Sequence, residues 1–254
     1  MKVLTVSNLK GGVGKTTTSV CLASLCARRG LRTLLVDLDP QASATDYLGL
    51  YQAAADGDAN ATGMLYKDMG VAECAHDTRV EGLMCVPTTL SLIDQNELLL
   101  REQRLRFALE DAAGDFDVAV IDTAPSAKGL AMCSYVAAAG NGCVVIPVKL
   151  DSTVMRGTAS AVAGVRAVSN ELRLPAPDYR ILRTMVPGRM TNAELAGARI
   201  LDEFFPDRQL ESVIHHSCKV VEGSWQWKPI VEYMPRNRVA KDYEALGKEL
   251  GLWA

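Results

Sequence analysis

Apolar residues fall into two alternating patterns along this chain. Short runs rich in β-branched residues predict strands, and the longer stretches between them, whose apolar positions recur at helical spacing, predict helices. The predicted strands are Val3–Ser7, Thr33–Asp37, Gly82–Val86, Asp117–Ile121, Cys143–Val148 and Ile181–Val186. The predicted helices cover residues 16–29, 90–110, 129–138, 153–171 and 191–205.

Most of the predicted strands are apolar at nearly every position, which is typical of strands that are covered on both faces of a sheet. Strands that alternate with helices in this way favour parallel pairing through right-handed crossovers. We therefore expect an α/β fold, in which helices flank a doubly wound, mostly parallel sheet.

Two stretches lie outside this regular alternation. Between Tyr47 and Arg79 the pattern is poor, and we expect a surface loop with one or two short helices. Near the end of the chain, the stretch Arg236–Leu250 places Val239, Tyr243 and Leu246 on one helical face. Its outer face mixes lysines with acids and lacks the basic excess of a membrane-surface helix, so we expect it to pack on the protein's own core.

Length and composition favour one domain spanning residues 1–254. With 254 residues, of which 48% are hydrophobic and 22% charged, the chain is long enough to bury a full core. The net charge of −3 gives no global attraction to nucleic acid, so any such contact needs a local basic patch. No leader segment or membrane-spanning run is evident, and we expect a cytoplasmic protein with no membrane partner.

The seven cysteines do not predict a metal or redox site. Their number is odd, no C-x-x-C pair occurs, and most lie within apolar stretches. We expect small buried residues of a reduced compartment.

A glycine-rich segment follows the first predicted strand and precedes the first helix. Its sequence, Asn8-Leu-Lys-Gly-Gly-Val-Gly-Lys-Thr-Thr17, has the order in which backbone N–H groups converge on a phosphate chain. In such a loop Lys15 reaches the β- and γ-phosphates of ATP and the Thr16 hydroxyl binds Mg²⁺. The predicted nucleotide-binding residues are Lys10, Gly11, Gly12, Val13, Gly14, Lys15, Thr16 and Thr17.

The loop departs from the usual G-x-x-x-x-G-K-[ST] form, because Leu9 occupies the first glycine position and Lys10 follows it. A second lysine at the mouth of the loop is not needed to hold the phosphates in cis. It is therefore free to serve a nucleotide across a subunit boundary, as an arginine finger does.

Carboxylates end two of the other predicted strands. Asp37 ends the second predicted strand and Asp39 lies two residues beyond it, and Asp122 directly follows the predicted strand Asp117–Ile121. Ligands of such sheets bind at the carboxyl ends of the strands. Asp122 is suited to holding a water of the magnesium ion.

With these motifs, the chain resembles the ParA/MinD family of deviant Walker-motif ATPases, and within it the short ParA-type partition ATPases. The most specific matches are the lysine-bearing loop, Asp37-Leu-Asp-Pro-Gln41 and Ile121-Asp-Thr-Ala-Pro-Ser126. The resemblance implies that Lys10 enters the partner's site in an ATP-dependent homodimer, that Asp39 supports hydrolysis and that Asp122 supports the metal. It implies catalytic roles for Lys10, Lys15 and Asp39.

The resemblance extends through the carboxyl half and implies nonspecific double-stranded DNA, a ParB-like or other adaptor and the nucleoid as partners. Arg189 and Lys219 match positions at which the family places DNA-binding arginines. His215 and His216 stand where proline and arginine are usual, and Gly223–Trp227 replaces an alanine-proline-serine-histidine-glycine stretch. For Trp225 and Trp227 we favour core packing over a partner surface.

Two other classes share the loop. A MinD-like membrane-associated ATPase is the main alternative, and it needs a terminal basic amphipathic helix. An electron-transferring iron protein needs cysteines for a cluster between subunits, and Cys85 and Cys133 are the nearest candidates, although neither lies in the expected glycine-rich context.

Overall fold

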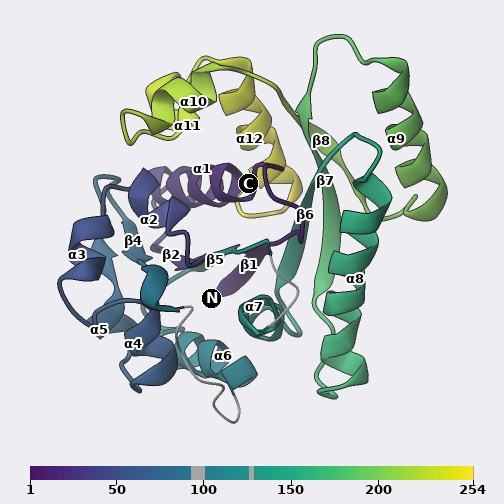
Figure 1. The fold of residues 1–254 in the computed structure, drawn as a ribbon. Helices are drawn as coiled ribbons and strands as arrows, with labels where there is room; N and C mark the ends of the chain where they lie inside the picture. The colour runs from purple at the N-terminus through teal and green to yellow at the C-terminus, as the bar shows by residue number, and fades with distance from the viewer. Residues whose placement is uncertain (93–100, 126–128, 254) are drawn as a thin grey trace.

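A computed structural model describes residues 1–92, 101–125 and 129–253, and within them a single sheet of eight strands has the order β3-β4-β2-β5-β1-β6-β7-β8 (Figure 1). Every pairing is parallel except that of β3 with β4. The strands are β1 (Lys2–Val6), β2 (Thr33–Leu38), β3 (His76–Asp77), β4 (Leu83–Val86), β5 (Val118–Thr123), β6 (Cys143–Lys149), β7 (Asp178–Val186) and β8 (Gln209–His215).

Helices connect the strands and cover the sheet on both sides. The described helices are α1 (Lys15–Arg28), α2 (Ser43–Tyr47), α3 (Tyr51–Ala55), α4 (Ala61–Tyr66), α5 (Val71–Cys74), the 3₁₀ turn η1 (Leu90–Leu92), α6 (Arg101–Asp111), α7 (Leu130–Ala137), α8 (Val154–Asn170), α9 (Asn192–Phe204), α10 (Lys219–Ser224), α11 (Ile230–Tyr233) and α12 (Arg238–Glu249). In Figure 1, α1 and α12 lie on one side of the central strands, and α6 and α7 lie on the other.

Alternate residues of the central strands pack on opposite faces. In β2, Leu35 joins the cluster formed with α1 and α12, whereas Leu34 and Val36 join the cluster formed with α4 and α6. All three side chains have no exposed surface. This double coverage explains why the strands are apolar throughout, and it confirms the predicted doubly wound α/β fold.

The predicted strands all occur, with small shifts at their ends. Three parts of the pattern were missed or underestimated. The edge strands β3 and β8 were not predicted, because β3 has two residues and β8 is half exposed. For the stretch 47–79, the expectation of a surface loop with one or two short helices underestimates the structure. Three short helices, α3, α4 and α5, lie within it, α2 ends at its start, and residues such as Ala54 and Leu65 are buried. Each of these helices is too short to show a clear helical period.

The predicted helix over 90–110 is confirmed in part. Its ends are the turn η1 and α6, and the residues between them, 93–100, lie outside the described structure. The other predicted helices, with their ends shifted by one or two residues, correspond to α1, α7, α8 and α9. Helix α9 begins with the capping pair Thr191 and Glu194, each of which accepts the other's backbone N–H at the helix start.

The last helix packs as predicted. Val239, Tyr243 and Leu246 of α12 are buried against α1, and the Tyr243 hydroxyl lies 3.2 Å from Thr18 Oγ1. Its apolar face is therefore not available to a membrane surface. Within the described ranges, none of the helices combines the length and apolarity required to cross a bilayer.

The preference for core packing of the tryptophans is wrong. Trp225 is 83% exposed and Trp227 is 52% exposed. The reason lies in α10, whose Gly223 faces inward so closely that an added Cβ would lie 2.7 Å from the Lys228 carbonyl oxygen. Two residues further along a helical path the side chain points the opposite way, so Trp225 points to solvent. Trp227 stacks on Arg79, with 5.3 Å between the guanidinium carbon and the ring centre.

Five of the seven cysteines are buried as predicted; Cys143 is partly buried and Cys218 is exposed. Cys85 packs with the α1 cluster, whereas Cys133 packs with the α4 and α6 cluster on the other side of the sheet. Both side chains are fully buried. Neither is placed to hold an iron–sulfur cluster between subunits.

Candidate nucleotide site

The glycine-rich loop runs from the end of β1 to the start of α1, at the carboxyl edge of the sheet. Gly12 and Gly14 have φ angles of 68° and 83°, in the left-handed region where side chains other than glycine are strained. At Gly11 an added Cβ would meet no atom within 4 Å. The protein itself does not require glycine there, and that space is open to a ligand.

Two strands anchor the loop from below. The Asn8 side chain donates to the Pro147 carbonyl oxygen of β6 at 2.7 Å and accepts the Lys10 backbone N–H at 3.0 Å. The Thr184 hydroxyl of β7 donates to the Val13 carbonyl oxygen at 2.8 Å. Sequence reasoning missed Thr184, because nothing near it in the chain marks it. These contacts within the chain hold the loop in shape.

Lys15 opens α1 and is only 6% exposed. Its ammonium group donates to the Lys10 carbonyl oxygen at 3.0 Å, across the loop. Burial lowers the pKa of Lys15, and the nearby charges of Asp122 and Asp39 oppose that shift. The structure therefore brings together the predicted phosphate lysine and two of the predicted carboxylates.

Asp37 and Asp122 are register partners at the ends of the neighbouring strands β2 and β5, and neither has exposed surface. Burial raises the pKa of both carboxyl groups, and the charge of Asp37 raises that of Asp122 further. Asp122 Oδ1 accepts a hydrogen bond from Ser19 at 2.9 Å, whereas Oδ2 forms none within the described ranges. A buried carboxylate oxygen without a donor needs a water or a cation.

The two aspartates of the β2 segment differ in their contacts. Asp37 accepts hydrogen bonds from the backbone and hydroxyl of Thr45, both at 2.8 Å, and from the Asp39 backbone N–H at 3.0 Å. Asp37 therefore fixes the turn into α2. Asp39 is 7% exposed, and its Oδ1 accepts the Gln41 backbone N–H at 3.0 Å. Asp39 lies beside Lys15, and its carboxylate accepts fewer hydrogen bonds than that of Asp37.

The residues predicted for the metal lie together. Thr16 and Ser19 are both on α1, and the proximity of their hydroxyl groups lowers the pKa of Asp122, against the larger effect of burial. This set of a hydroxyl and a carboxylate with an unused oxygen fits Mg²⁺, which prefers oxygen ligands and retains several waters. Thr17, also predicted in this site, is partly buried on the next position of α1.

Lys10 is not part of the cis cradle. Its ammonium group forms an ion pair with Asp151 and donates to the Thr153 hydroxyl at 2.8 Å, both in the segment between β6 and α8. Burial alone would raise the pKa of Asp151, but the hydrogen bonds from Lys10 and Thr153 lower it to about 2. Asp151 and Thr153 were not predicted from the sequence.

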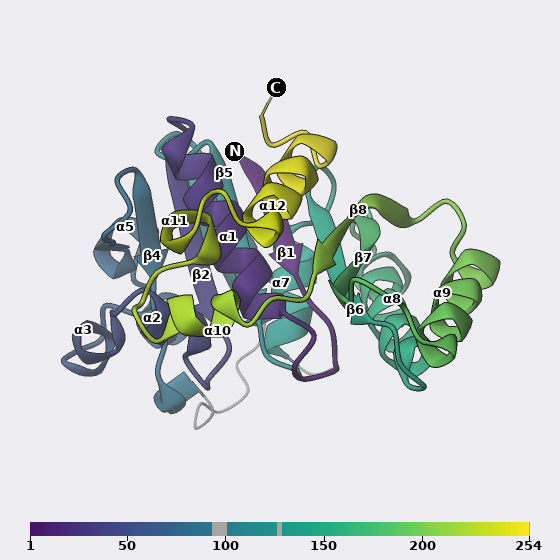
Figure 2. The ribbon, with the colours of Figure 1, turned by 90° about the horizontal axis from the view of Figure 1, so that it is seen from above.

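The two residues predicted to bind DNA follow adjacent strands. Arg189 comes three residues after Val186 of β7, and Lys219 starts α10 shortly after β8. Val186 pairs with His215, and His216 donates its backbone N–H to Val186, so both segments leave the same edge of the sheet. Figure 2 shows α10 on the edge that also carries the loop between β1 and α1.

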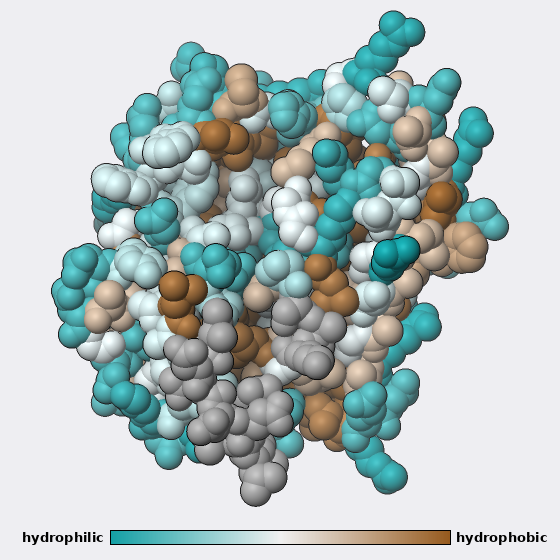
Figure 3. Space-filling model, in the orientation of Figure 1, coloured by the Kyte–Doolittle hydropathy of each residue, from teal (hydrophilic) through white to brown (hydrophobic). Residues whose placement is uncertain are grey.

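The surroundings of these cations differ. Arg189 is exposed, whereas the Lys219 ammonium group pairs with Glu222 of the same helix at 2.6 Å. His215 turns inward and contacts Asp242 of α12 through Nδ1 at 2.8 Å, so it is a packing contact within the chain. In the view of Figure 3, the surface mixes hydrophilic side chains with small, separate hydrophobic patches.

Comparison with known proteins gives one consistent group. A family model described as an AAA domain matches residues 1–175. The sporulation initiation inhibitor protein Soj of Bacillus subtilis is 35% identical, with 98% of each chain covered. The chromosome partitioning protein ParA of Myxococcus xanthus is 33% identical, with 98% of this chain and 87% of that protein covered.

Solved structures agree on the fold. A variant of McdA from Cyanothece in complex with ATP superposes with a TM-score of 0.88 at 19% identity and covers 100% of this chain and 98% of that one. Cobyrinic acid a,c-diamide synthase from Mycobacterium smegmatis, with a bound ATP analogue and magnesium, gives 0.76 at 26% identity and covers 89% and 96%.

The buried carboxylate pair predicts how stability depends on pH in EDTA without nucleotide. The pKa of Asp122 is raised to about 7 in the folded protein, against about 3.9 in an unfolded chain, so the folded state holds the proton more strongly. Stability should therefore fall as the pH rises from about 4 to about 7. Asp122→Asn should raise the free energy of unfolding at pH 8 by about 1–3 kcal/mol, as measured by urea unfolding.

Asp117→Asn is the matched control, because the Arg32 guanidinium lowers the pKa of Asp117 and that exposed pair stabilises the protein at high pH instead. The gain from Asp122→Asn should vanish below about pH 4, where both states of the native protein hold the proton. A variant that is less stable than the native protein at pH 8 would contradict the charge repulsion described for Asp37 and Asp122.

Proposed function

The chain belongs to the ParA/Soj family of P-loop ATPases, and we propose that its single domain forms an ATP-dependent sandwich dimer that binds nonspecific double-stranded DNA. In this proposal a ParB-like adaptor stimulates hydrolysis, and the cycle segregates or positions a plasmid, a chromosome or another cargo. The protein is an ATPase of the chromosome- and plasmid-partitioning kind. The dimer, the DNA and the adaptor are the proposed parts, and they imply a cytoplasmic, nucleoid-associated protein.

One observation carries the proposal: the site contains two lysines with separate positions. Lys15 lies inside the cradle beside Asp122 and Asp39, where it can neutralise the β- and γ-phosphates. Lys10 leaves the loop in another direction, toward Asp151 and Thr153. A cation at the mouth of the loop that does not enter its own cradle is suited to a nucleotide held by a facing subunit.

When bound with ATP, Mg²⁺ would supply positive charge that offsets the negative charge developing on the phosphate oxygens. Thr16 and Asp122 would hold it, as the unsatisfied Asp122 Oδ2 supports. The backbone N–H groups of Gly11 to Thr16 bind the phosphates. Asp39, beside Lys15 and nearly buried, is placed to orient a water or to respond to the γ-phosphate, and we assign it to the hydrolytic step.

The Lys10–Asp151 pair gives the monomer a resting position for the trans lysine. Both side chains are about a third exposed, so water partly screens the pair and little free energy is needed to separate the two charges. When a second subunit approaches with ATP bound, Lys10 exchanges one carboxylate for phosphate oxygens of higher charge. The exchange makes dimerisation depend on the nucleotide.

DNA binding in this proposal comes from one edge of the dimer. Arg189 and Lys219 follow neighbouring parallel strands, so a monomer presents them on one edge and a symmetric dimer doubles them. Phosphate contacts of this kind carry no sequence information, which suits nonspecific binding. The Lys219–Glu222 pair reduces the charge that Lys219 offers to phosphate.

Lys10→Ala should bind ATP as a monomer and fail to dimerise. Losing a charged contact across an interface costs about 2–5 kcal/mol, which weakens dimerisation by about 30-fold or more. Light scattering with a non-hydrolysable ATP analogue measures the mass of the species, and calorimetry measures nucleotide affinity. Asp151→Asn is the matched control, because it frees Lys10 and should favour the dimer at lower protein concentration. Normal dimerisation of Lys10→Ala would exclude the trans role.

Arg189→Glu should weaken binding of the ATP-bound dimer to all duplex sequences about equally. Each lost phosphate contact should reduce the log–log salt slope by about one unit, or about two per symmetric dimer. Glu222→Gln should act in the opposite direction, since it releases Lys219. Arg166→Glu, an equal charge change in the last turns of α8, is the control. If Arg189→Glu and Arg166→Glu have the same salt titration as the native protein, the DNA surface lies elsewhere.

A further inference from the structure

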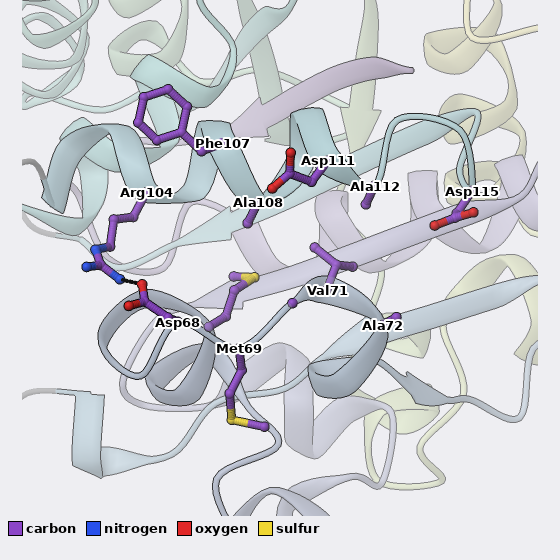
Figure 4. A pocket seen from close by; sticks show the side chains of 12 residues that line it. Asp68, Met69, Val71, Ala72, Arg104, Phe107, Ala108, Asp111, Ala112 and Asp115 are labelled. Atoms are coloured by element: carbon purple, nitrogen blue, oxygen red, sulfur yellow. Dashed lines mark hydrogen bonds and ion pairs between the residues drawn. The ribbon is translucent and has the colours of Figure 1, made fainter.

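A groove lies between α5 and α6, on the side of the sheet opposite α1 and α12 (Figure 4). It encloses about 500 Å³. Ala108 of α6 and Ala112, the residue after the end of that helix, point across it toward Val71 of α5. The groove contains none of the residues that form the nucleotide site, so it is a separate surface of the molecule.

The floor of the groove is apolar. Met69, Val71, Ala108 and Ala112 contribute to its lining, and Phe107 stands at its rim with 48% of its surface exposed. The small side chains of Ala108 and Ala112 keep the space between the two helices open. An exposed aromatic ring beside a concave apolar surface is a common feature of sites that receive the side chains of another protein.

The rim of the groove is acidic. Asp68, Asp111 and Asp115 line it, and the cation among the described lining residues, Arg104, already pairs with Asp68. Asp111 forms no side-chain hydrogen bond or ion pair with any part of the chain that the structure describes. Two of the three carboxylates are therefore not neutralised by a side chain within the groove.

The end of α6 strengthens this negative charge. Asp111 is the last residue of the helix, Asp115 follows in the next turn, and the last turn contains no basic residue. The carbonyl groups at a helix carboxyl end carry partial negative charge, so acids at that position are unfavourable. At Asp115 the nearby Arg32 guanidinium, which donates to the Gly114 carbonyl oxygen at 2.7 Å, relieves part of this repulsion. A cation placed beside Asp111 would relieve the rest.

We propose that this groove binds a basic amphipathic helix of a partner protein. Apolar residues of the helix at spacings of three and four would enter between α5 and α6. Lysines or arginines beside them would pair with Asp111 and Asp115. An acidic rim disfavours nucleic acid and anionic membrane. A second copy of this chain is disfavoured too, because the exposed faces of its charged helices mix acids with bases, as on α12.

The test uses a defined probe on the full chain. A fluorescein-labelled 18-residue peptide of leucine, lysine and alanine, with leucines at helical spacing and lysines on both flanks, is titrated with protein and followed by anisotropy. A second peptide carries glutamate in place of every lysine. The native protein should bind the lysine peptide and should not bind the glutamate peptide.

Three variants assign that binding to the groove. The double variant Asp111→Lys/Asp115→Lys should weaken binding of the lysine peptide at least about tenfold, and Phe107→Ala about fivefold. Glu203→Lys, an equal type of charge change on the exposed surface of α9, should change it less than twofold. Basal ATP hydrolysis should be unchanged in all of them, since none touches the nucleotide site, and this shows that each variant is folded.

Three outcomes would overturn the proposal. One is equal binding of the lysine peptide by the native protein and the double variant. Another is no binding by the native protein. A third is self-association of the native protein without nucleotide that the double variant loses, which would assign the groove to a second copy of the chain. Because the readout needs no ATP, a failure here is separate from a failure of the proposed dimer.

Discussion

Two carboxylates buried side by side at the ends of β2 and β5 set the character of the whole site. Asp37 and Asp122 are register partners with no exposed surface, and burial raises the pKa of each. The charge of Asp37 raises the pKa of Asp122 further, and the charge of Asp39 does the same for Asp37. The negative charge is stabilised by a buried lysine, Lys15, and by hydroxyl and backbone donors from α1 and α2. A cation brought by a nucleotide would complete the balance, because one oxygen of Asp122 has no donor among the residues that the structure describes.

Contacts within the chain also fix the shape of the loop. Its left-handed backbone positions fall on Gly12 and Gly14, where they cause no strain, and two of its carbonyl groups accept hydrogen bonds from Thr184 and Lys15. A preformed cradle spends less binding free energy on ordering, so more of the phosphate affinity is available to assemble the dimer in our proposal. Lys10 lies just outside this rigid frame, in a partly exposed ion pair, where exchange of partners is least costly.

The sequence predicted what depends on local pattern. The apolar runs of β1, β2 and β5, the phosphate loop and the carboxylates at the ends of β2 and β5 follow from residue types within a few positions, and they occur where expected. What it could not predict depends on neighbours far along the chain. Nothing near Thr184 or Asp151 indicates that these residues hold the loop and Lys10.

Other misses had the same cause. The tryptophans of the α10 segment point to solvent because Gly223 packs inward, which only the position of Lys228 and Tyr233 reveals. The groove between α5 and α6 also escaped prediction, since α5 has four residues and Asp111 and Asp115 look like ordinary solvated acids in the sequence. Tertiary packing turns such residues into a surface with a defined charge and shape.

The central claim is that ATP joins two subunits through Lys10, and the variant Asp39→Ala tests it most directly. The substitution removes a carboxylate that we assign to hydrolysis and not to nucleotide binding, so ATP should remain bound and the ATP-bound protein should accumulate. In sedimentation velocity this variant should run as a dimer with ATP and as a monomer with ADP, whereas Lys10→Ala/Asp39→Ala should remain a monomer with either. A monomeric Asp39→Ala protein at saturating ATP, or a double variant that dimerises as well as the single one, would contradict the account.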